Sequence, residues 1–114
     1  MAEPWARSVE GLMVTFTASV TGEAINDFAR LSGDDYEAHT DEAFMATSSF
    51  GRRIAHGALL VGYMSAAGTK AIRASRERGN DSLPVSLGYD RLRFVAPAFL
   101  GDTVTVIYEV EEVD

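Results

Sequence analysis

The feature of this sequence that most constrains its fold is an apolar stretch over residues 57–72 that has no broad polar face. Placed on a helix, the stretch has large apolar side chains on nearly every side: Leu59, Leu60, Val61, Tyr63, Met64 and Ile72. A helix that is apolar nearly all round is buried in the middle of a fold rather than placed on its surface. The stretch is too short to cross a bilayer, which takes about 20 residues. The sequence therefore predicts a central helix that other elements surround.

Strands are predicted where apolar and polar residues alternate. The alternation is clear over residues 13–20 and 103–110, and residues 85–95 resume strand character before Ala96-Pro97. A period of two residues is typical of a strand with one face in the core and one face in water. Because a helix buried all round needs a sheet wrapped around it, the order of elements predicts an α+β fold with an antiparallel sheet.

Short helices are predicted between the first strand and the central helix. Thr21 is a suitable N-cap for a helix over residues 23–31, which the following Ser-Gly pair would end. Residues 34–39 hold too few apolar side chains for an element and are predicted to form a loop. Thr40 is then expected to cap a second short helix that ends near residue 50.

Composition limits the classes of function that the chain can have. Its 114 residues are 46% hydrophobic, which suits one compact domain over residues 1–114 that would gain from association with a second copy. Without cysteine there is no disulfide, no thiolate nucleophile and no sulfur-bound zinc. A net charge of −7 argues against nucleic-acid binding, and no signal peptide is recognisable. We therefore expect a cytoplasmic protein that binds neither nucleic acid nor membrane.

The residues best suited to catalysis gather just before the central helix. Asp34 precedes His39 by one short segment, and Gly57 opens the apolar stretch. Histidine is suited to proton transfer near neutral pH, and the N–H of a glycine that opens a helix can stabilise a developing oxyanion. Taken alone, however, an aspartate and a histidine at this spacing more often form a turn and pack in a loop. Gly57 needs no function either, so both interpretations stay open at this point.

Other candidate residues have weaker support. His56 is more often a structural residue at the mouth of a helix, and Ser65 is usually a small packing residue, although its hydroxyl could reach a site along the helix. No G-x-S-x-G elbow, phosphate-binding loop or dinucleotide fingerprint occurs in the sequence. Two histidines and scattered carboxylates give little support to a metal site, so we expect neither a metal nor a cofactor.

Several blocks of the sequence resemble the MaoC-like dehydratases, the family of (R)-specific enoyl-CoA hydratases. FARLSGD at residues 28–34, HTD at 39–41 and FGRRIAHG at 50–57 resemble its hydratase-2 motif. FVAPAFLGDTV at residues 94–104 is similar to the family's later strand-and-turn signature. The blocks occur in the family's order and cover nearly the whole chain. The resemblance implies a hot-dog fold, in which an antiparallel sheet wraps around a long helix and the sheets of two copies join in a dimer.

The resemblance also implies an activity and a set of site residues. Asp34 and His39 would activate a water for addition to a trans-2-enoyl thioester, while the Gly57 amide would polarise the thioester carbonyl. Ser65 matches a position that lines the site in relatives. Further residues would contact the acyl-CoA or acyl-carrier substrate: Tyr36, Arg52, Arg53, Ile54, Ala55 and His56. The candidates for contact with its phosphates are the arginines Arg52, Arg53, Arg91 and Arg93.

The chain departs from the family's pattern in two places. Tyr36-Glu37 stands where relatives usually have Asn-Pro, so a rigid φ is lost and a bulkier side chain is gained. We expect altered loop geometry and altered acyl-chain selectivity. Relatives also continue through a further hairpin after the strand at 103–110. Either the usual C-terminal strands are missing from this sequence, which we favour, or the sheet is incomplete and has an open edge that invites pairing with another chain.

The leading hypothesis is an (R)-specific enoyl-thioester hydratase that also acts as a 3-hydroxyacyl-thioester dehydratase. One alternative is a hot-dog thioesterase, which would release free CoA thiol. The other is a non-catalytic module that binds acyl thioesters or dimerises, which Tyr36-Glu37 and the short C-terminus motivate. The position of His39 and the Ala55-His56-Gly57 block favour the hydratase.

Overall fold

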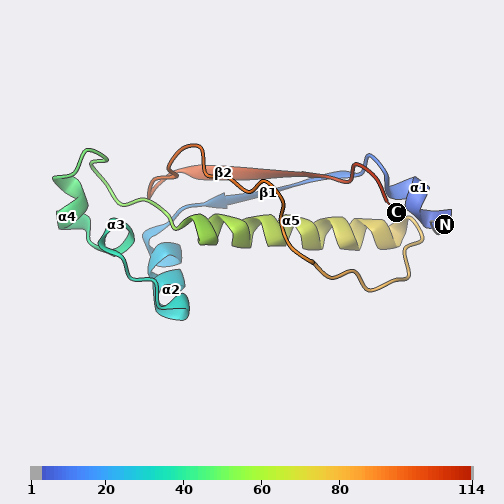
Figure 1. Ribbon diagram of the computed structural model, residues 1–114, viewed down its shortest axis with the longest axis horizontal. Helices are drawn as coiled ribbons and strands as arrows, with labels where there is room; N and C mark the ends of the chain where they lie inside the picture. Colours follow the sequence, from blue (N-terminus) through green and yellow to red (C-terminus); the bar gives the residue numbers. More distant parts are fainter. Residues whose placement is uncertain (1–3, 114) are drawn as a thin grey trace. The chain divides into compact units, whose positions relative to one another are not determined.

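Five helices and two strands are present in the computed structural model, which describes residues 4–113 (Figure 1). In chain order they are α1 (Pro4–Val9), β1 (Met13–Ser19), α2 (Gly22–Ser32), α3 (Glu37–Thr40), α4 (Glu42–Ala46), α5 (Gly57–Glu77) and β2 (Thr103–Glu109). The short helix α1 has no counterpart among the predicted elements. None of the helices over residues 4–113 combines the length and the apolar content that a membrane crossing requires.

The described residues form two compact units. Unit 2 comprises residues 17–62 and 93–104, and unit 1 comprises the rest of the described chain, including residues 63–92. Unit 2 contains all of α2, α3 and α4, and unit 1 contains all of α1. The expected single domain over residues 1–114 stays a prediction.

The strands β1 and β2 pair as an antiparallel two-stranded sheet, which confirms the two clearest predicted strands (Figure 1). In unit 1, the Gly11 N–H donates to the Val110 carbonyl at 2.7 Å, and the Val110 N–H donates to the Leu12 carbonyl at 2.9 Å. In unit 2, Val20 pairs with the turn at Gly101, because the Gly101 N–H donates to the Val20 carbonyl at 2.7 Å. On β1 alternate residues are half-buried, as a period of two requires.

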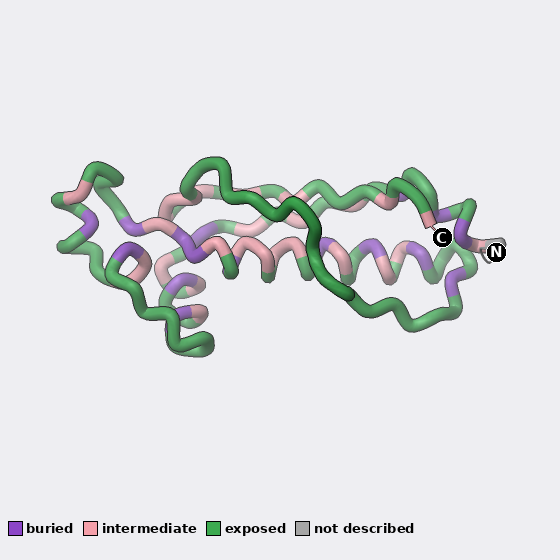
Figure 2. The backbone as a smooth tube through the Cα atoms, viewed as in Figure 1, coloured by how far each residue is buried: buried purple, intermediate pink, exposed green. Residues whose placement is uncertain are grey.

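The predicted strand over residues 85–95 is wrong. This segment has no regular structure and is exposed along its whole length (Figure 2). Two residues break the extended backbone, since Gly88 has a φ of 151° and Arg91 has a φ of 55°. A left-handed residue cannot continue a strand, and within residues 4–113 no neighbouring strand pairs with the segment. The apolar alternation is present in the sequence, but it lacks a sheet to join.

The helix α2 forms where the sequence predicts it, between Thr21 and Gly33. The Thr21 hydroxyl oxygen accepts a hydrogen bond from the Ala24 N–H at 3.0 Å, which is an N-cap. Gly33 has a φ of 84°, and its N–H donates to the Ala29 carbonyl, so it ends the helix in the left-handed conformation that favours glycine. Asp34 is therefore the first residue after the C-cap of α2.

The next two helices differ from the prediction. Residues 34–39 are not entirely a loop, because α3 contains His39. Thr40 is not an N-cap, since its hydroxyl donates to the Asp35 carbonyl at 2.9 Å. Asp41 caps α4 instead, and its carboxylate accepts from the Phe44 N–H at 2.9 Å. The helix α4 ends at Ala46 rather than near residue 50.

The long helix α5 begins at Gly57 as predicted and continues to Glu77, beyond the expected end at residue 72. In unit 1 it packs against β1: the Lys70 ammonium donates to the Thr15 carbonyl at 2.5 Å, and the Tyr63 ring lies 6.1 Å from the Phe16 ring. Burial all round is wrong for the described residues. One stripe is buried, formed by Leu59, Ala67, Ala71 and Ser75, and another is exposed, formed by Ala58, Gly62, Ser65 and Thr69. The reason is that residues 4–113 supply two strands, too few to surround a helix.

Candidate active site

His39 is held in a defined orientation inside unit 2. Its Nδ1 lies 2.8 Å from the Ile54 carbonyl oxygen. Because a carbonyl oxygen only accepts hydrogen bonds, Nδ1 must carry the proton, and the lone pair of the neutral ring is then on Nε2. The backbone carbonyl of His39 accepts a further bond from the Arg53 guanidinium at 3.2 Å. The half-buried imidazole therefore presents a basic nitrogen from a fixed ring.

Asp34 lies beside this imidazole. One carboxylate oxygen of Asp34 and one ring nitrogen each of His39 and His56 all lie within 4.8 Å of one another. The carboxylate is exposed, and one of its oxygens accepts a long hydrogen bond of 3.4 Å from the Tyr36 N–H. The short helix α3 is what brings the two residues together, because it turns the chain between Asp34 and His39. A water molecule could bridge groups at this separation.

His56 lies beneath the pair and is 1% exposed. Its ring stacks on the His39 ring, with centroids 3.9 Å apart and planes at 26°. On another side it meets the Phe28 ring, with centroids 4.8 Å apart. Its Nε2 lies 2.8 Å from the Asp34 carbonyl oxygen and donates to it. Its Nδ1 is buried and has no partner among the described residues.

These three side chains have the composition of a metal site but a poor geometry for one. Ligands on one ion must point their lone pairs at a common centre about 2 Å away. The two imidazole rings are stacked at 26°, so their nitrogen lone pairs lie in two nearly parallel planes instead of converging. One nitrogen of each ring is also occupied as a donor to a carbonyl. The arrangement suits proton transfer better than metal coordination.

A cavity of about 370 Å³ lies next to His39 in unit 2. Its walls are mostly apolar and are formed by His39, Phe50, Ile54, Ala55, Gly57, Leu60, Phe94, Val95, Ala96, Pro97 and Ala98. Gly57 is the first residue of α5, and the first four N–H groups of a helix have no partner within it. The positive end of the helix dipole thus borders the same cavity as the imidazole. This combination can bind an apolar molecule and polarise one of its oxygens.

Of four predicted substrate-binding residues in unit 2, two line this cavity and two do not. Ile54 and Ala55 line it, and the Ala55 N–H donates to the Ala98 carbonyl at 2.7 Å, which holds the two walls together. Tyr36 is exposed and meets the His39 ring edge-on at 5.7 Å. Arg53 is 8% exposed, and its guanidinium donates to the Asn26 side chain at 2.8 Å as well as to His39.

Arg52 is placed differently from its neighbour. Its guanidinium lies over the Phe99 ring at 4.4 Å and 3.8 Å from an Asp102 carboxylate oxygen, and the side chain is half exposed. A cation on an aromatic ring at the surface is held in place and is still accessible to an anion. Arg91 and Arg93 are exposed, and Arg91 has the positive φ that interrupts the segment before Phe94.

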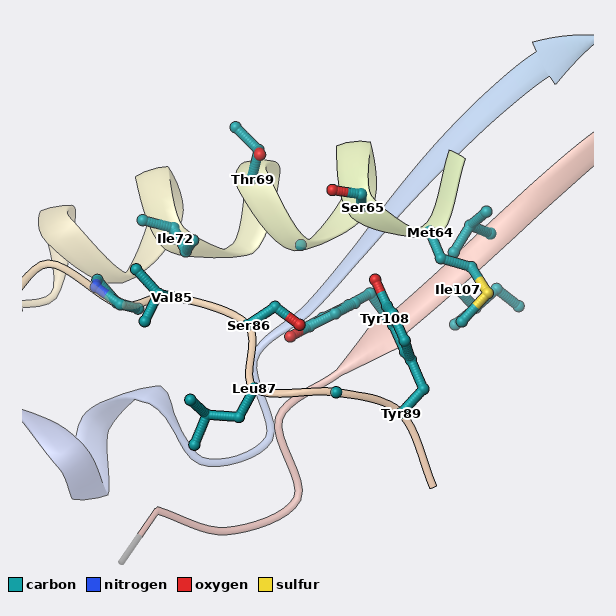
Figure 3. A pocket seen from close by; sticks show the side chains of 14 residues that line it. Met64, Ser65, Thr69, Ile72, Val85, Ser86, Leu87, Tyr89, Ile107 and Tyr108 are labelled. Atoms are coloured by element: carbon teal, nitrogen blue, oxygen red, sulfur yellow. The ribbon is translucent and has the colours of Figure 1, made fainter. Parts of the chain in front are cut away.

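Ser65 lies in unit 1 and faces another cavity. This cavity has a volume of about 570 Å³ and is bounded by α5, β2 and residues 84–89. Figure 3 shows Ser65 on the helix, Ser86 and Leu87 on the connecting segment, and Tyr108 on the strand. The hydroxyl of Ser65 thus borders a space of mixed polar and apolar walls.

Sequence reasoning missed the far wall of the unit 2 cavity. Phe94, Pro97 and Ala98 line it, and they belong to the block that resembles the family's later signature. The signal is therefore present in the sequence, although the block by itself predicts only a strand and a turn. Phe28 belongs to the first motif block and to the apolar face of the helix predicted over residues 23–31, but no local pattern shows that its ring supports His56.

Comparison with known proteins gives consistent matches. The family model described as "MaoC like domain" matches residues 9–114. The (R)-specific enoyl-CoA hydratase of Rhodospirillum rubrum is 35% identical over 89% of this chain and 65% of its own length. The 3-hydroxybutyryl-CoA dehydratase of Methylorubrum extorquens is 33% identical over 90% of this chain and 60% of its own length. The chain thus spans less than two thirds of these relatives.

Solved structures support the same assignment. The unliganded R-hydratase PhaJ1 from Pseudomonas aeruginosa superposes with a TM-score of 0.74 and 34% identity, over 93% of this chain and 63% of that one. The (R)-hydratase from A. caviae superposes with a TM-score of 0.67 and 31% identity, over 88% and 70% of the two chains. These neighbours have the hot-dog fold, and this chain shares it, with an antiparallel sheet and a long helix. By sequence and by structure, the chain belongs to the MaoC-like domain family.

Proposed function

We propose that this chain catalyses the reversible addition of water to a trans-2-enoyl thioester, giving an (R)-3-hydroxyacyl thioester. The observation that carries the proposal is the pairing of an Asp34 carboxylate with a tethered His39 beside an apolar cavity that the start of α5 also borders. The names of two relatives, an (R)-specific enoyl-CoA hydratase and a 3-hydroxybutyryl-CoA dehydratase, support it.

In the proposed reaction each group has one task. The thioester carbonyl accepts a hydrogen bond from the Gly57 N–H, which draws electron density from the conjugated double bond. A water held between the Asp34 carboxylate and His39 Nε2 attacks C3 and gives a proton to Nε2 as the C3–O bond forms. The π-electron pair moves toward C2 and the carbonyl oxygen, and the Gly57 N–H stabilises the resulting enolate. Return of the proton to C2 completes the addition of H₂O and restores His39.

The walls of the cavity set the class of substrate in this proposal. Phe50, Leu60 and Phe94 provide apolar surface for an acyl chain. Of the neighbouring pair Arg52 and Arg53, Arg52 is the better placed to meet the phosphates of CoA or of an acyl carrier, because Arg53 is buried and already bonded. A homodimer and a cytoplasmic location, both expected from the sequence, stay predictions, as does a role for Ser65.

The product of the reaction tests the proposed function. The protein is mixed with a short trans-2-enoyl-CoA, and the products are separated and resolved by chirality. The proposal expects (R)-3-hydroxyacyl-CoA and no free CoA thiol. Release of thiol, detected with a thiol reagent, would indicate the thioesterase alternative. Saturable binding of the enoyl-CoA with no product at all would indicate a binding module.

Gly57 gives a prediction about the shape of the site. A Cβ built at this position would lie 2.6 Å from the Phe94 ring, a distance that real Cβ atoms essentially never show. The variant Gly57→Ala must displace this ring, which lines the cavity, so we expect kcat/KM for an enoyl-CoA to fall about tenfold. The double variant Gly57→Ala/Phe94→Ala removes the clash and should recover part of the loss. If Phe94→Ala only adds to the defect, the steric explanation is wrong.

Metal removal gives a second prediction. Because Asp34 and His39 are arranged for proton transfer and the stacked His56 ring does not converge with His39 on a common centre, the hydratase rate should not depend on a metal ion. We expect dialysis against a chelator to leave kcat unchanged, and added Zn²⁺ to inhibit if it has any effect, since it would occupy the basic nitrogen of His39. A rate that is lost on chelation and restored by one specific divalent ion would contradict the proposed roles of these residues.

A further inference from the structure

We propose that His56 is a positioning residue that fixes Asp34 and His39 relative to each other without touching the substrate. The inference rests on the proposed function and adds a third residue to its machinery. From the sequence, His56 is either a structural residue at the mouth of the helix or, by the family resemblance, a substrate contact. The structure places it in the core beneath Asp34 and His39.

The first contact of His56 restrains the backbone of Asp34. His56 Nε2 donates to the backbone carbonyl of Asp34 at 2.8 Å, across 22 residues of sequence. Asp34 directly follows the left-handed Gly33, and its own N–H is bonded to the Ser32 hydroxyl at 3.1 Å. The His56 hydrogen bond is thus the long-range restraint on the backbone that carries the Asp34 carboxylate. Because that carboxylate is exposed, little other packing restrains it.

The second contact of His56 restrains the ring of His39, the proposed base. The His56 ring stacks on the His39 ring at 3.9 Å, and the Phe28 ring packs against His56 at 4.8 Å. His39 is then restrained in two ways, by the Nδ1 hydrogen bond to Ile54 and by the face of the ring beneath it. The hydrogen bond fixes one atom of the ring, and the stack fixes the plane in which Nε2 points. Both restraints are needed to aim a lone pair at a small target.

Burial separates His56 from the substrate. Its side chain is 99% covered, and it is not among the described residues that line the cavity next to His39. Its immediate neighbours in the chain, Ala55 and Gly57, do line that cavity. An effect of His56 on the chemical step must therefore pass through Asp34 and His39. This position predicts an effect on kcat with little effect on KM.

Three substitutions separate the two contacts. His56→Phe retains a ring that can stack on His39 and Phe28 but loses the hydrogen bond to Asp34. His56→Gln retains an N–H donor at the reach of Nε2 but loses the ring. His56→Leu loses both. We expect kcat to fall about tenfold for each of the first two and about 100-fold for His56→Leu, with KM little changed, because small displacements of reacting groups cost rates of this size.

Two controls distinguish positioning from simple destabilisation. Ile25→Val trims a fully buried apolar residue of the same unit that does not line the cavity next to His39, so it should lower the unfolding temperature and leave kcat unchanged. In a His39→Asn background, His56→Leu should lower the residual rate much less than in the wild type, since there is no longer a base to position.

The outcomes of these measurements distinguish a failure of the positioning role of His56 from a failure of the proposed function. If wild type hydrates an enoyl-CoA and folded His56→Leu keeps the wild-type kcat, the positioning role is wrong and the proposed function stands. A rise in KM with kcat unchanged would instead make His56 a substrate-binding residue and overturn the inference. If wild type itself produces no hydration, the proposed function fails first, and the inference that rests on it fails with it.

Discussion

Replacing His39 with asparagine is expected to lower kcat for hydration of a short trans-2-enoyl-CoA about 1,000-fold. The asparagine side chain can still donate to the Ile54 carbonyl from the position of Nδ1, so the tether of α3 to residue 54 can be kept. What it lacks is the basic nitrogen at Nε2. General acid–base catalysis by a positioned side chain contributes roughly 10²- to 10⁴-fold, and this prediction lies in the middle of that range.

The comparison of two variants at His39 sharpens this prediction. His39→Ala loses the base, the tether and the stack on His56, so it should be as inactive as His39→Asn and also less stable to heat. The unfolding temperature of each variant shows whether the loss is catalytic or structural. A folded His39→Asn protein with more than about a tenth of the wild-type kcat would mean that His39 is not the base.

Replacing Asp34 with asparagine should have an effect of similar size, about 1,000-fold in kcat. The substitution is nearly isosteric, and the backbone carbonyl that accepts the hydrogen bond from His56 is unchanged. The side chain loses its charge and one acceptor, and with them the ability to orient a water against His39. Because the carboxylate is exposed and its hydrogen bond from the Tyr36 N–H is long at 3.4 Å, the stability of the fold should change little.

The neighbouring aspartate provides a matched control for this prediction. Asp35 is exposed and one position further along the chain, and its backbone carbonyl accepts from the Thr40 hydroxyl. Asp35→Asn removes the same charge from the same loop but does not alter the carboxylate beside His39. It should keep the wild-type kcat. Equal losses in the two variants would point to the charge of the loop rather than to a specific carboxylate.

Elements with local determinants could be predicted from the sequence. Thr21 and Gly33 bound α2 because a hydroxyl that caps a helix and a glycine that takes a left-handed φ act within a few residues. The choice between Thr40 and Asp41 as the next cap could not be made this way. Both residue types are suitable caps, and the outcome depends on the contact of the Thr40 hydroxyl with the Asp35 carbonyl.

Elements that depend on distant partners could not be predicted. The alternation over residues 85–95 is real, but a strand forms only beside another strand, and Arg91 with its positive φ ends any extended run. In the site, too, local features could be predicted and features that depend on distant residues could not. The spacing of Asp34 and His39 was visible in the sequence, whereas the tether of His39 to Ile54 and the contact of Phe94 with Gly57 join segments far apart in the chain.

The central claim is that Asp34 and His39 act together to add water to an enoyl thioester. The most direct measurement follows the loss of the conjugated absorbance of trans-2-enoyl-CoA substrates with wild type, Asp34→Asn and His39→Asn, each shown to be folded. The structure predicts steady hydration by wild type and rates at least about 100-fold lower for both variants. Equal rates for wild type and Asp34→Asn across acyl chain lengths would contradict it.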